Sequence, residues 1–373
     1  MIVFLSILFA SYCLLTLCLL TGWRRSVKQT SLSPATEDHF ISVVIPVRNE
    51  QHTLASLLGD LRHQRYLHFE VIVVDDHSND DTRFIVTNAM DNDPRVRLLT
   101  NTGSGKKSAL STGIDAAQGV LIVTTDGDCR VPADWLFEVN KSFQRAEVKM
   151  AIGPVKIDGN GLFSAMQAIE FSSLIASGVA TLSFGMPTMC NGANLAFRRA
   201  AYYDVNGYDD NLHIASGDDE FLMRKVFTRY HTGVKFMGLT GTLVSTKPPD
   251  WRAFFQQRIR WAGKWRYNPT LEKGGLALYI FLFQFVTMLL PWFAWVDLLP
   301  WSWASGLWTM KVVTEFFFLH NAARAMRINW RWDAFTALQI LYPFYVVGIG
   351  ITCNFASFTW KERRLASGKE KTG

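Results

Sequence analysis

The chain has 373 residues, a formal net charge of +6 and five cysteines. This length leaves room for one catalytic domain of about 250 residues together with membrane segments. Basic residues directly follow apolar runs, as Arg24 and Arg25 do, and the polar middle has no basic stripe interleaved with aromatic residues. We therefore expect a membrane protein without a nucleic-acid partner. No cysteine pair has metal-ligand spacing, which argues against a zinc site or a disulfide framework and for a reducing compartment.

The first twenty residues are apolar and uncharged, and Thr21-Gly22-Trp23-Arg24-Arg25 follows them. A cleavable signal peptide carries its positive charge before the apolar core and a small-x-small site after it. Here the charge comes after the core, and no such site is evident. About twenty residues are enough to cross a bilayer as a helix. The sequence therefore predicts a retained transmembrane anchor over residues 1–23 with its N-terminus outside.

The middle of the chain alternates short β-branched runs with stretches of helical period. Runs rich in Val and Ile cover residues 41–47, 69–74 and 120–124, and helical periods cover residues 50–62 and 106–118. Strands that alternate with helices form βαβ units and a mostly parallel sheet. We therefore expect an α/β catalytic domain over residues 41–250, with ligands at the carboxyl ends of its strands.

Acidic residues follow each predicted strand. Glu50 comes after the first, Asp75 and Asp76 come directly after the second, and Asp126-Gly127-Asp128 comes after the third. Helix capping is an alternative explanation for Ser78 or Asp80 in the stretch after the second strand. Capping explains two carboxylates that flank a glycine poorly, because such a pair is costly without a bound cation. The sequence predicts a divalent metal at Asp126 and Asp128.

The last third of the chain contains three apolar stretches. Residues 276–299 form one, interrupted by Pro291, and residues 334–355 form a clear final one. Residues 301–323 are less apolar because they contain Lys311 and Glu315, which are four residues apart and can pair on one helix face. We expect an interfacial amphipathic segment over residues 251–273 and a membrane region with two to three spans over residues 274–360.

The number of spans determines the side of the basic tail at Lys361, Arg363 and Arg364. If all three stretches cross, the tail lies outside, against the positive-inside tendency. If the middle stretch lies in the interface or re-enters, the tail returns to the cytosol, although three arginines between residues 324 and 331 then lie outside or at the interface. We favour the second arrangement with a cytosolic tail.

Five motifs together resemble the family 2 glycosyltransferases, which have a GT-A fold. They are Ile45-Pro46-Val47-Arg48-Asn49-Glu50, Val74-Asp75-Asp76-x-Ser78-x-Asp80-x-Thr82, Asp126-x-Asp128, Gly217-Asp218-Asp219-Glu220 and Gln257-Arg258-Ile259-Arg260-Trp261. They occur in the family's order and cover roughly residues 41 to 265. The membrane-integrated branch, with the ceramide glucosyltransferase, cellulose synthase and hyaluronan synthase types, is closest in character.

The resemblance implies a nucleotide-sugar pocket. Asp76 would contact the base and ribose, with Asp75 close by and Pro46 and Glu50 lining the pocket, because a carboxylate can accept hydrogen bonds from a base N–H or a ribose hydroxyl. Asp126, with its neighbouring carboxylate at residue 128, would hold Mg²⁺ or Mn²⁺ on the diphosphate, since hard cations bridge carboxylates to phosphate oxygens.

Further residues are assigned in the same way. Lys106 follows a Gly-rich turn and opens a helix, which suits donor phosphate, although a solvated basic turn is the plain alternative. Asp219 would be the general base of a transfer with inversion. Asp218 stands where the family more often has Glu, which leaves the division of roles between these two acids open.

Gln257, Arg260 and Trp261 lie on one amphipathic segment just before an apolar stretch. The resemblance implies that Arg260 stabilises the diphosphate and that Trp261 stacks on the acceptor. An interfacial helix anchored at the lipid headgroups is the alternative, and both can hold together.

The sequence thus predicts a metal-dependent, inverting glycosyltransferase of the hexosyltransferase type on the cytosolic face of the membrane. It would move a sugar from a UDP- or GDP-linked donor to a lipid or lipid-linked acceptor, one sugar at a time, because few spans are available to build a polymer channel. A processive polysaccharide synthase, a nucleotidyl- or phosphosugar transferase and a non-catalytic membrane subunit remain alternatives.

Overall fold

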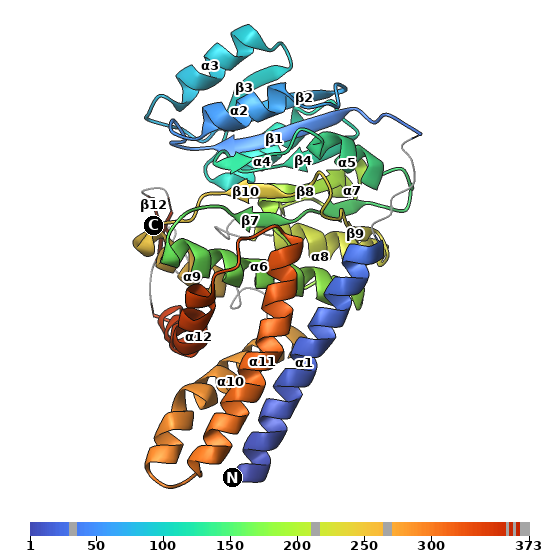
Figure 1. The fold of residues 1–373 in the computed structure, drawn as a ribbon. Helices are drawn as coiled ribbons and strands as arrows, with labels where there is room; N and C mark the ends of the chain where they lie inside the picture. Colours follow the sequence, from blue (N-terminus) through green and yellow to red (C-terminus); the bar gives the residue numbers. More distant parts are fainter. Residues whose placement is uncertain (30–35, 210–216, 264–270, 356–357, 361–362, 366–373) are drawn as a thin grey trace. The chain divides into compact units, whose positions relative to one another are not determined.

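The computed structural model describes residues 1–29, 36–209, 217–263, 271–355, 358–360 and 363–365 (Figure 1). The chain forms two compact units. The sheet unit comprises residues 23–158 and 175–247, and the helical unit comprises residues 1–22, 159–174 and 248–373.

The sheet unit is built on a seven-stranded mixed sheet with the order β3-β2-β1-β4-β8-β6-β9. Its strands are β1 (Ile41–Val47), β2 (Phe69–Asp75), β3 (Val96–Thr100), β4 (Leu121–Thr124), β6 (Met150–Ile152), β8 (Leu195–Arg198) and β9 (Val234–Phe236). The pairs among β3, β2, β1 and β4 are parallel, and β8 runs antiparallel to both β4 and β6. The α/β fold class and all three predicted strands are therefore confirmed.

Helices and a second small sheet complete this unit. The helices are α2 (Leu54–Arg62), α3 (Thr82–Asn92), α4 (Lys106–Asp115), α5 (Trp135–Ser142), α7 (Arg199–Asp204), α8 (Asp218–Tyr230) and the 3-10 turn η1 (Gly192–Asn194). The small sheet contains β5 (Cys129–Arg130), β10 (Val244–Thr246) and β7 (Val155–Ile157). Gly113 lets α4 approach the sheet closely, because a Cβ there would lie 2.4 Å from Val44 and 3.0 Å from Val74.

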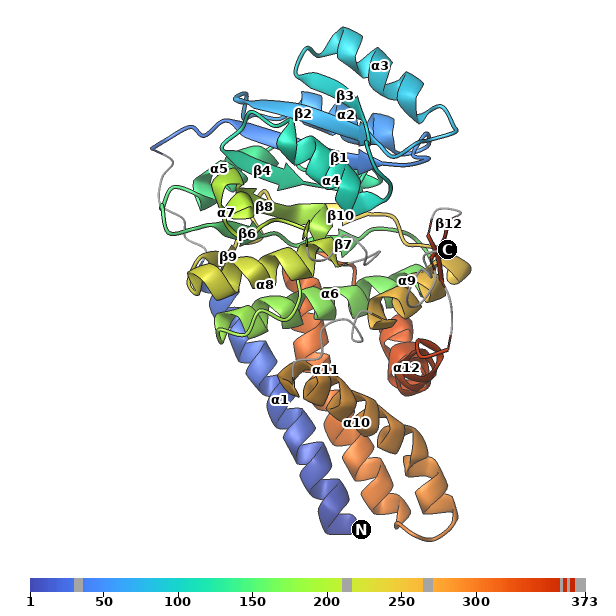
Figure 2. The same cartoon turned by 180° about the vertical axis from the view of Figure 1, so that it is seen from behind.

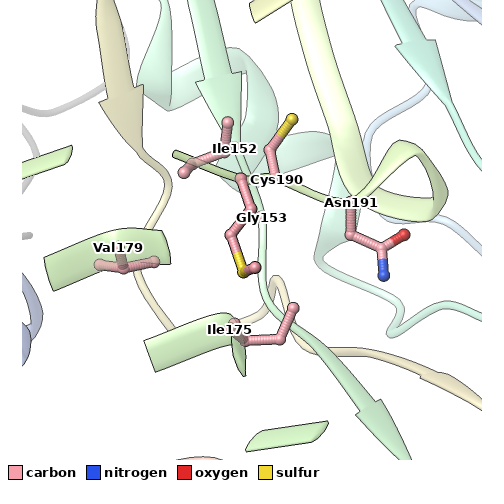
Figure 3. Close-up of a pocket in the computed structure, with 7 residues that line it drawn as sticks. Ile152, Gly153, Ile175, Val179, Cys190 and Asn191 are labelled. Carbon is pink, nitrogen blue, oxygen red and sulfur yellow. The ribbon is translucent and has the colours of Figure 1, made fainter. Parts of the chain in front are cut away.

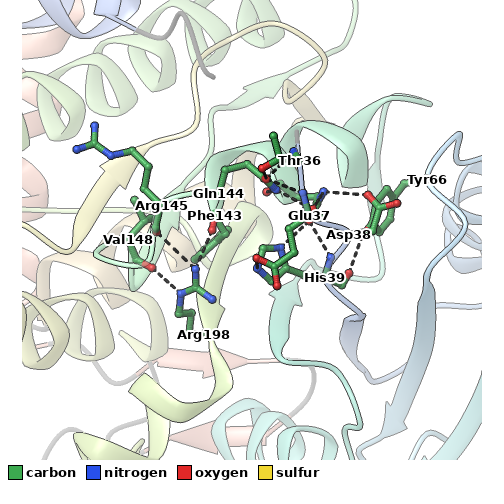
Figure 4. Close-up of polar contacts among 11 residues, drawn as sticks. Thr36, Glu37, Asp38, His39, Tyr66, Phe143, Gln144, Arg145, Val148 and Arg198 are labelled. Atoms are coloured by element: carbon green, nitrogen blue, oxygen red, sulfur yellow. Dashed lines mark hydrogen bonds and ion pairs between the residues drawn. The ribbon is translucent and has the colours of Figure 1, made fainter. Parts of the chain in front are cut away.

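A polar network holds the segment that leads into β1 (Figure 4). Oε1 of Gln144 accepts hydrogen bonds from the main-chain N–H groups of Thr36 (2.8 Å) and Glu37 (2.9 Å). Oδ1 of Asn140, which is on α5, accepts from the N–H of His39 (3.1 Å). These bonds hold the segment that precedes β1 and so help to position β1, whose carboxyl end lies at the sheet edge that carries the predicted site.

The helical unit contains long apolar helices and one shorter, amphipathic helix of 13 residues, α9. They are the first part of α1 (Ile2–Gln29), the first part of α6 (Leu162–Ser183), then α9 (Trp251–Gly263), α10 (Leu271–Trp295), α11 (Trp301–Ala325) and α12 (Trp332–Thr352). By length and composition, α1, α6, α10 and α12 could each span a membrane. The sequence prediction missed α6, whose mean hydropathy of 1.3 is the lowest of the four. The short strands β11 (Phe358–Trp360) and β12 (Arg363–Leu365) follow.

A buried polar tetrad joins α1, α11 and α12. Lys311 Nζ donates to Glu315 Oε2 and to Gln339 Oε1, both at 2.9 Å. Tyr12 Oη donates to Glu315 Oε1 at 2.6 Å, and Gln339 Nε2 donates to Glu315 Oε2 at 2.9 Å. The predicted pairing of the two charges is therefore present, and each oxygen of the carboxylate has a donor. This explains how α11 carries two charges among apolar helices.

Candidate active site

The strand ends that carry the predicted site lie at one edge of the parallel sheet. Val47 at the end of β1 is in register with Asp75 at the end of β2, and the N–H of Asp76 donates to the Val47 carbonyl at 2.8 Å. Pro46 is the penultimate residue of β1, and β4 ends on the other side of β1. Parallel strands thus bring these residues together, although they are far apart in the sequence.

Asp75 is held inside the protein by its own neighbours. Its Oδ1 accepts from the Ser78 N–H at 3.1 Å, and its Oδ2 pairs with Arg83 Nη1 at 2.9 Å. Its side chain is only 1% exposed. Both oxygens have intramolecular partners, so the visible task of Asp75 is to shape the loop after β2. Arg83 was not singled out from the sequence, since a lone arginine on a helix gives no signal.

Asp76 ties the end of β2 to the Gly-rich turn that opens α4. Its Oδ1 accepts from Asn101 Nδ2 at 2.7 Å and from the Gly105 N–H at 3.0 Å. Gly105 has φ +91°, which favours glycine, and the chain turns there into Lys106. The loop that carries Lys106 is thereby fixed to the residue predicted to bind the nucleotide.

The loop after β1 packs against the loop after β4. Oε2 of Glu50 accepts from Thr53 Oγ1 at 2.9 Å. A Cβ at Gly127 would lie 3.1 Å from side-chain carbons of both Glu50 and Val47. A glycine between Asp126 and Asp128 therefore allows the acidic loop to approach β1 closely.

Lys106 connects two acidic motifs that are 92 positions apart in the sequence. Its Nζ lies 2.7 Å from Asp126 Oδ1 and 3.3 Å from Asp218 Oδ2. Burial lowers the pKa of the amine, and the carboxylates of Asp126 and Asp218 more than offset this effect. The pKa therefore lies above the ordinary lysine value, and the ammonium form persists across the physiological pH range.

Asp219 lies beside the η1 turn. Its Oδ2 accepts from the Gly192 N–H at 3.0 Å, and its Oδ1 accepts from the Glu220 N–H at 2.7 Å. A Cβ at Gly192 would lie 2.9 Å from Asp218 Oδ2, so this glycine permits the close approach of the acid pair. Asn191 caps the turn by accepting from the N–H of Ala193 at 2.9 Å. Asp218 and Asp219 begin α8, and the Nζ atom of Lys106 lies beside the first of them.

The residues present fit a hard divalent cation with a small protein ligand set. Asp126 and Asp128 flank Gly127, and Asp128 Oδ2 accepts from Thr246 Oγ1 at 3.2 Å. Among the described residues, no three His, Cys, Asp or Glu side chains form a metal cluster. Magnesium and similar ions commonly use one or two carboxylates and take their remaining ligands from substrate phosphate and water. The ammonium of Lys106 beside Asp126 shows that this edge attracts positive charge.

Beside Asn191 lies a small apolar hollow (Figure 3). Its enclosed space is about 20 Å³, enough for about one water molecule. It is lined by Ile152, Gly153, Ile175, Val179, Met189, Cys190 and Asn191. This hollow is too small for a sugar ring.

Gln257, Arg260 and Trp261 belong to the helical unit, on α9. Their neighbour Arg258 is 3% exposed and forms an ion pair with Glu170 of α6 at 2.5 Å. The Arg258 guanidinium also lies 4.5 Å from the centroid of the Trp261 ring. Sequence reasoning passed over Arg258, and its place within the Gln-x-x-Arg-Trp motif was the available signal.

Comparison with known proteins finds a family match over much of the sheet unit. Residues 42–206 match the model of glycosyl transferase family 2. The UDP-Glc:alpha-D-GlcNAc-diphosphoundecaprenol beta-1,3-glucosyltransferase of Escherichia coli is 30% identical over 144 residues, which are 37% of this chain and 56% of that protein. Poly-beta-1,6-N-acetyl-D-glucosamine synthase of Staphylococcus epidermidis is 24% identical over 253 residues, which are 65% of this chain and 60% of that protein. The chain thus spans less than two thirds of the length of both relatives.

A solved structure shares the fold over nearly the whole chain. The mannosyltransferase of Pyrobaculum calidifontis, solved in complex with GDP-Man and Mn²⁺, is 17% identical and superposes with a TM-score of 0.61. The match covers 95% of this chain and 99% of that one. At this identity the likeness concerns the fold, and it agrees with the GT-A type of sheet described above. Residues 42–206 of this chain are therefore a glycosyltransferase family 2 domain.

Proposed function

We propose that the protein is an inverting, metal-dependent glycosyltransferase that moves one sugar from a UDP- or GDP-linked donor to a lipid-linked acceptor at the cytosolic membrane face. The observation that carries this proposal is the position of Lys106 between Asp126 and Asp218. It joins a candidate metal loop, a candidate phosphate ligand and a candidate base motif. The Escherichia coli relative is named for a diphosphoundecaprenol acceptor, which supports a lipid-linked substrate.

Each acidic motif then has a separate chemical task. Asp219 removes the proton of the acceptor hydroxyl while that oxygen attacks the anomeric carbon. The bond from this carbon to the phosphate oxygen breaks, and the nucleoside diphosphate leaves with the bonding electrons. Lys106 donates hydrogen bonds to the diphosphate and stabilises its charge. Asp218 holds the ammonium in place, and Asp76 binds the nucleotide together with the loop that carries Lys106.

Asp126 and Asp128 would hold Mg²⁺ or Mn²⁺. Such an ion supplies a positive charge that stabilises the leaving diphosphate. Arg260 and Trp261 would contact the diphosphate and the acceptor, and Gln257 would complete that motif.

The direct test uses the purified full chain in detergent with membrane lipid extract. Radiolabelled UDP- and GDP-sugars are supplied with Mn²⁺, with Mg²⁺ or with EDTA. We expect lipid-soluble label and free nucleoside diphosphate in equal amounts, with loss of both in EDTA and recovery when metal is returned. Release of pyrophosphate or nucleoside monophosphate would instead indicate a nucleotidyl- or phosphosugar transferase.

The same reaction separates the alternatives within the family. The Staphylococcus epidermidis relative is named as a polysaccharide synthase, so product length is a necessary measurement. Mass spectrometry of the lipid product should show a single added sugar. A ladder of products would favour processive synthesis. If a chain with Asp128→Ala kept full metal-dependent donor binding by titration, the proposed metal site would be wrong.

A further inference from the structure

We propose that α1, α10 and α11 cross the bilayer as one bundle and that α12 lies across α10 and α11 inside the bilayer without crossing it. This arrangement differs from the sequence-based expectation, which left the middle apolar stretch in the interface and let the last one cross. It goes beyond the proposed activity because it concerns the lipid contacts of the helical unit.

The direction of the three crossing helices follows from their contacts. Leu5 and Phe9 of α1 belong to one apolar cluster with Leu290 of α10 and Ala304 of α11. Further along α1, Ser11 Oγ lies 2.8 Å from Tyr279 Oη, so α10 runs antiparallel to α1. Leu5 and Phe9 cluster with Ala304, whereas Cys13 further along α1 contacts Met310 further along α11, so these two helices run in the same direction. The first residues of α1 and the connection from α10 to α11 therefore lie at the same end of the unit (Figures 1 and 2).

Contacts with α11 also set a common depth for the three helices. Cys13 Sγ lies 3.8 Å from the Met310 carbonyl oxygen, and the Tyr12 ring stacks on Phe283 with centroids 3.7 Å apart. Position 310 of α11 and position 283 of α10 are thus level with the middle of the apolar part of α1.

At this depth α12 crosses over both neighbouring helices. Gln339 bonds to Lys311 of α11, and a Cβ at Gly350 would lie 2.7 Å from the Phe281 ring of α10. These two α12 positions are about 16 Å apart along a helix. Because both contact points are at a similar depth, α12 runs across the α10–α11 pair, as both views show (Figures 1 and 2).

The layer at this level includes α6 and α9. Ala165 and Ile169 of α6 form an apolar cluster with Ala334 and Leu338 of α12. The rings of Phe254 on α9 and Tyr345 on α12 have centroids 5.7 Å apart. The helix that carries the Gln-x-x-Arg-Trp motif therefore packs against α12.

The distribution of charge gives the orientation. Residues 1–23 contain no charged side chain, and residues 274–310 contain only Asp297. The opposite ends of the bundle carry Arg24, Arg25 and Lys28 after α1 and Arg324, Arg327 and Arg331 after α11. With three crossings, both basic groups and the basic tail face the cytosol, as the positive-inside rule requires. With α12 also crossing, the tail would lie outside, and with α12 crossing in place of α11, the arginines at 324, 327 and 331 would lie outside.

Tryptophans mark the opposite interface. Trp292, Trp295, Trp301 and Trp303 are between 46% and 76% exposed and surround the connection from α10 to α11. Exposed tryptophans concentrate at the headgroup level of membrane proteins, so this connection fits the outer surface of the bilayer.

Two exposed aspartates provide a matched test. Asp297 follows α10 and Asp333 opens α12, and the proposal places them on opposite sides of the membrane. The five native cysteines are replaced by serine, and single Asp297→Cys, Asp333→Cys and Ser367→Cys chains are treated in intact bacterial cells with a membrane-impermeant maleimide. We expect labelling of the first from outside, and of the other two only in inside-out vesicles.

Each other pattern overturns a defined part of the proposal. Labelling of position 333 from outside means that α11 does not cross, and labelling of position 367 alone from outside means that α12 does. If the cysteine-free chain fails to accumulate, fusions to the C-terminus of the native chain decide the second point. Fluorescence of a green fluorescent protein fusion supports an α12 that does not cross, and activity of an alkaline phosphatase fusion overturns it. None of these readouts depends on sugar transfer, so they stand apart from the proposed activity.

Discussion

Two lysines in this protein lie among carboxylates, and their surroundings differ. The Lys106 side chain in the sheet unit is 23% exposed and pairs with Asp126 and Asp218. It also interacts electrostatically with Asp219. Lys311 in the helical unit is fully buried and faces one carboxylate, Glu315, with the neutral Gln339 completing its contacts.

The two lysine clusters differ in the number of carboxylates near the ammonium and in their exposure to solvent. The Lys311 cluster has one positive and one negative charge, and each oxygen of its carboxylate accepts a hydrogen bond, so it needs no ligand. Among the described residues, the carboxylates of Asp126, Asp218 and Asp219 all act on the Lys106 ammonium, which is partly exposed. Carboxylates that gather in this way favour a nearby cation, which agrees with the metal and diphosphate chemistry proposed for this cluster.

The largest expected effect is at the acidic cluster. Asp219→Asn removes the proposed base, and a general base contributes about 10²- to 10⁴-fold to a rate. We expect kcat to fall by about that factor, while the donor KM changes little. The matched control is Glu220→Gln, one residue along α8, which should retain near-normal kcat. An unchanged kcat in Asp219→Asn, with normal thermal stability, would rule out Asp219 as the base.

Breaking the balanced cluster should affect stability instead of catalysis. Lys311→Met leaves Glu315 charged and without its cation, and removing one partner of a buried pair costs about 3–5 kcal/mol. We expect a large drop in the free energy of unfolding, measured as thermal stability in detergent. Adding Glu315→Gln to the same chain removes the stranded charge and should recover much of the loss. Equal stability of the single and double variants would contradict this account.

Removing Lys106 should weaken the binding of the nucleotide-sugar donor. Lys106→Met deletes a charged donor to the diphosphate, and hydrogen bonds to charged groups contribute about 1.5–3 kcal/mol. Donor KM should therefore rise by about 10- to 100-fold. Lys235→Met, which removes an exposed lysine of β9, is the charge-matched control and should leave KM unchanged. A KM effect of the same size in both variants would point to general electrostatics.

Salt should produce the smallest effect and distinguish the two clusters directly. Ionic screening acts on solvent-exposed charges and much less on buried pairs. Raising ionic strength tenfold should increase the donor KM by roughly two- to fivefold. The thermal stability of the helical unit should not decline in parallel. Loss of stability at the same salt concentrations would show that the Lys311 cluster is reached by solvent.

Local patterns in the sequence predict a large part of this structure. The strand over residues 41–47 was predicted with the bounds that β1 has, because a β-branched run that ends near Pro46 is a local signal. The pairing of Lys311 with Glu315 also follows from their spacing on one helix. What the sequence does not predict are the partners from distant elements. Tyr12 is 303 positions from Glu315, and no periodicity links them.

The acidic motifs show the same limit. Their place at the sheet edge follows from the strand pattern, but the role of each oxygen does not. Asp75 and Asp76 are neighbours in the sequence, yet one pairs with Arg83 and the other with the Gly-rich turn. The helix α6 was missed because it lacks the flanking basic residues that mark the other apolar runs, and Glu170 lies within it.

The network that holds the start of β1 has a consequence for mutational tolerance. The bonds from Thr36 and Glu37 to Gln144 use main-chain N–H groups, whereas Gln144 contributes its side chain. Any residue except proline can supply such an N–H, so positions 36 and 37 should accept wide substitution. Position 144 should not, because only a side chain of matching length and polarity reaches both groups. The contact therefore depends on the identity of Gln144 and not on that of Thr36 or Glu37. Among homologues, we expect position 144 to be retained and positions 36 and 37 to vary.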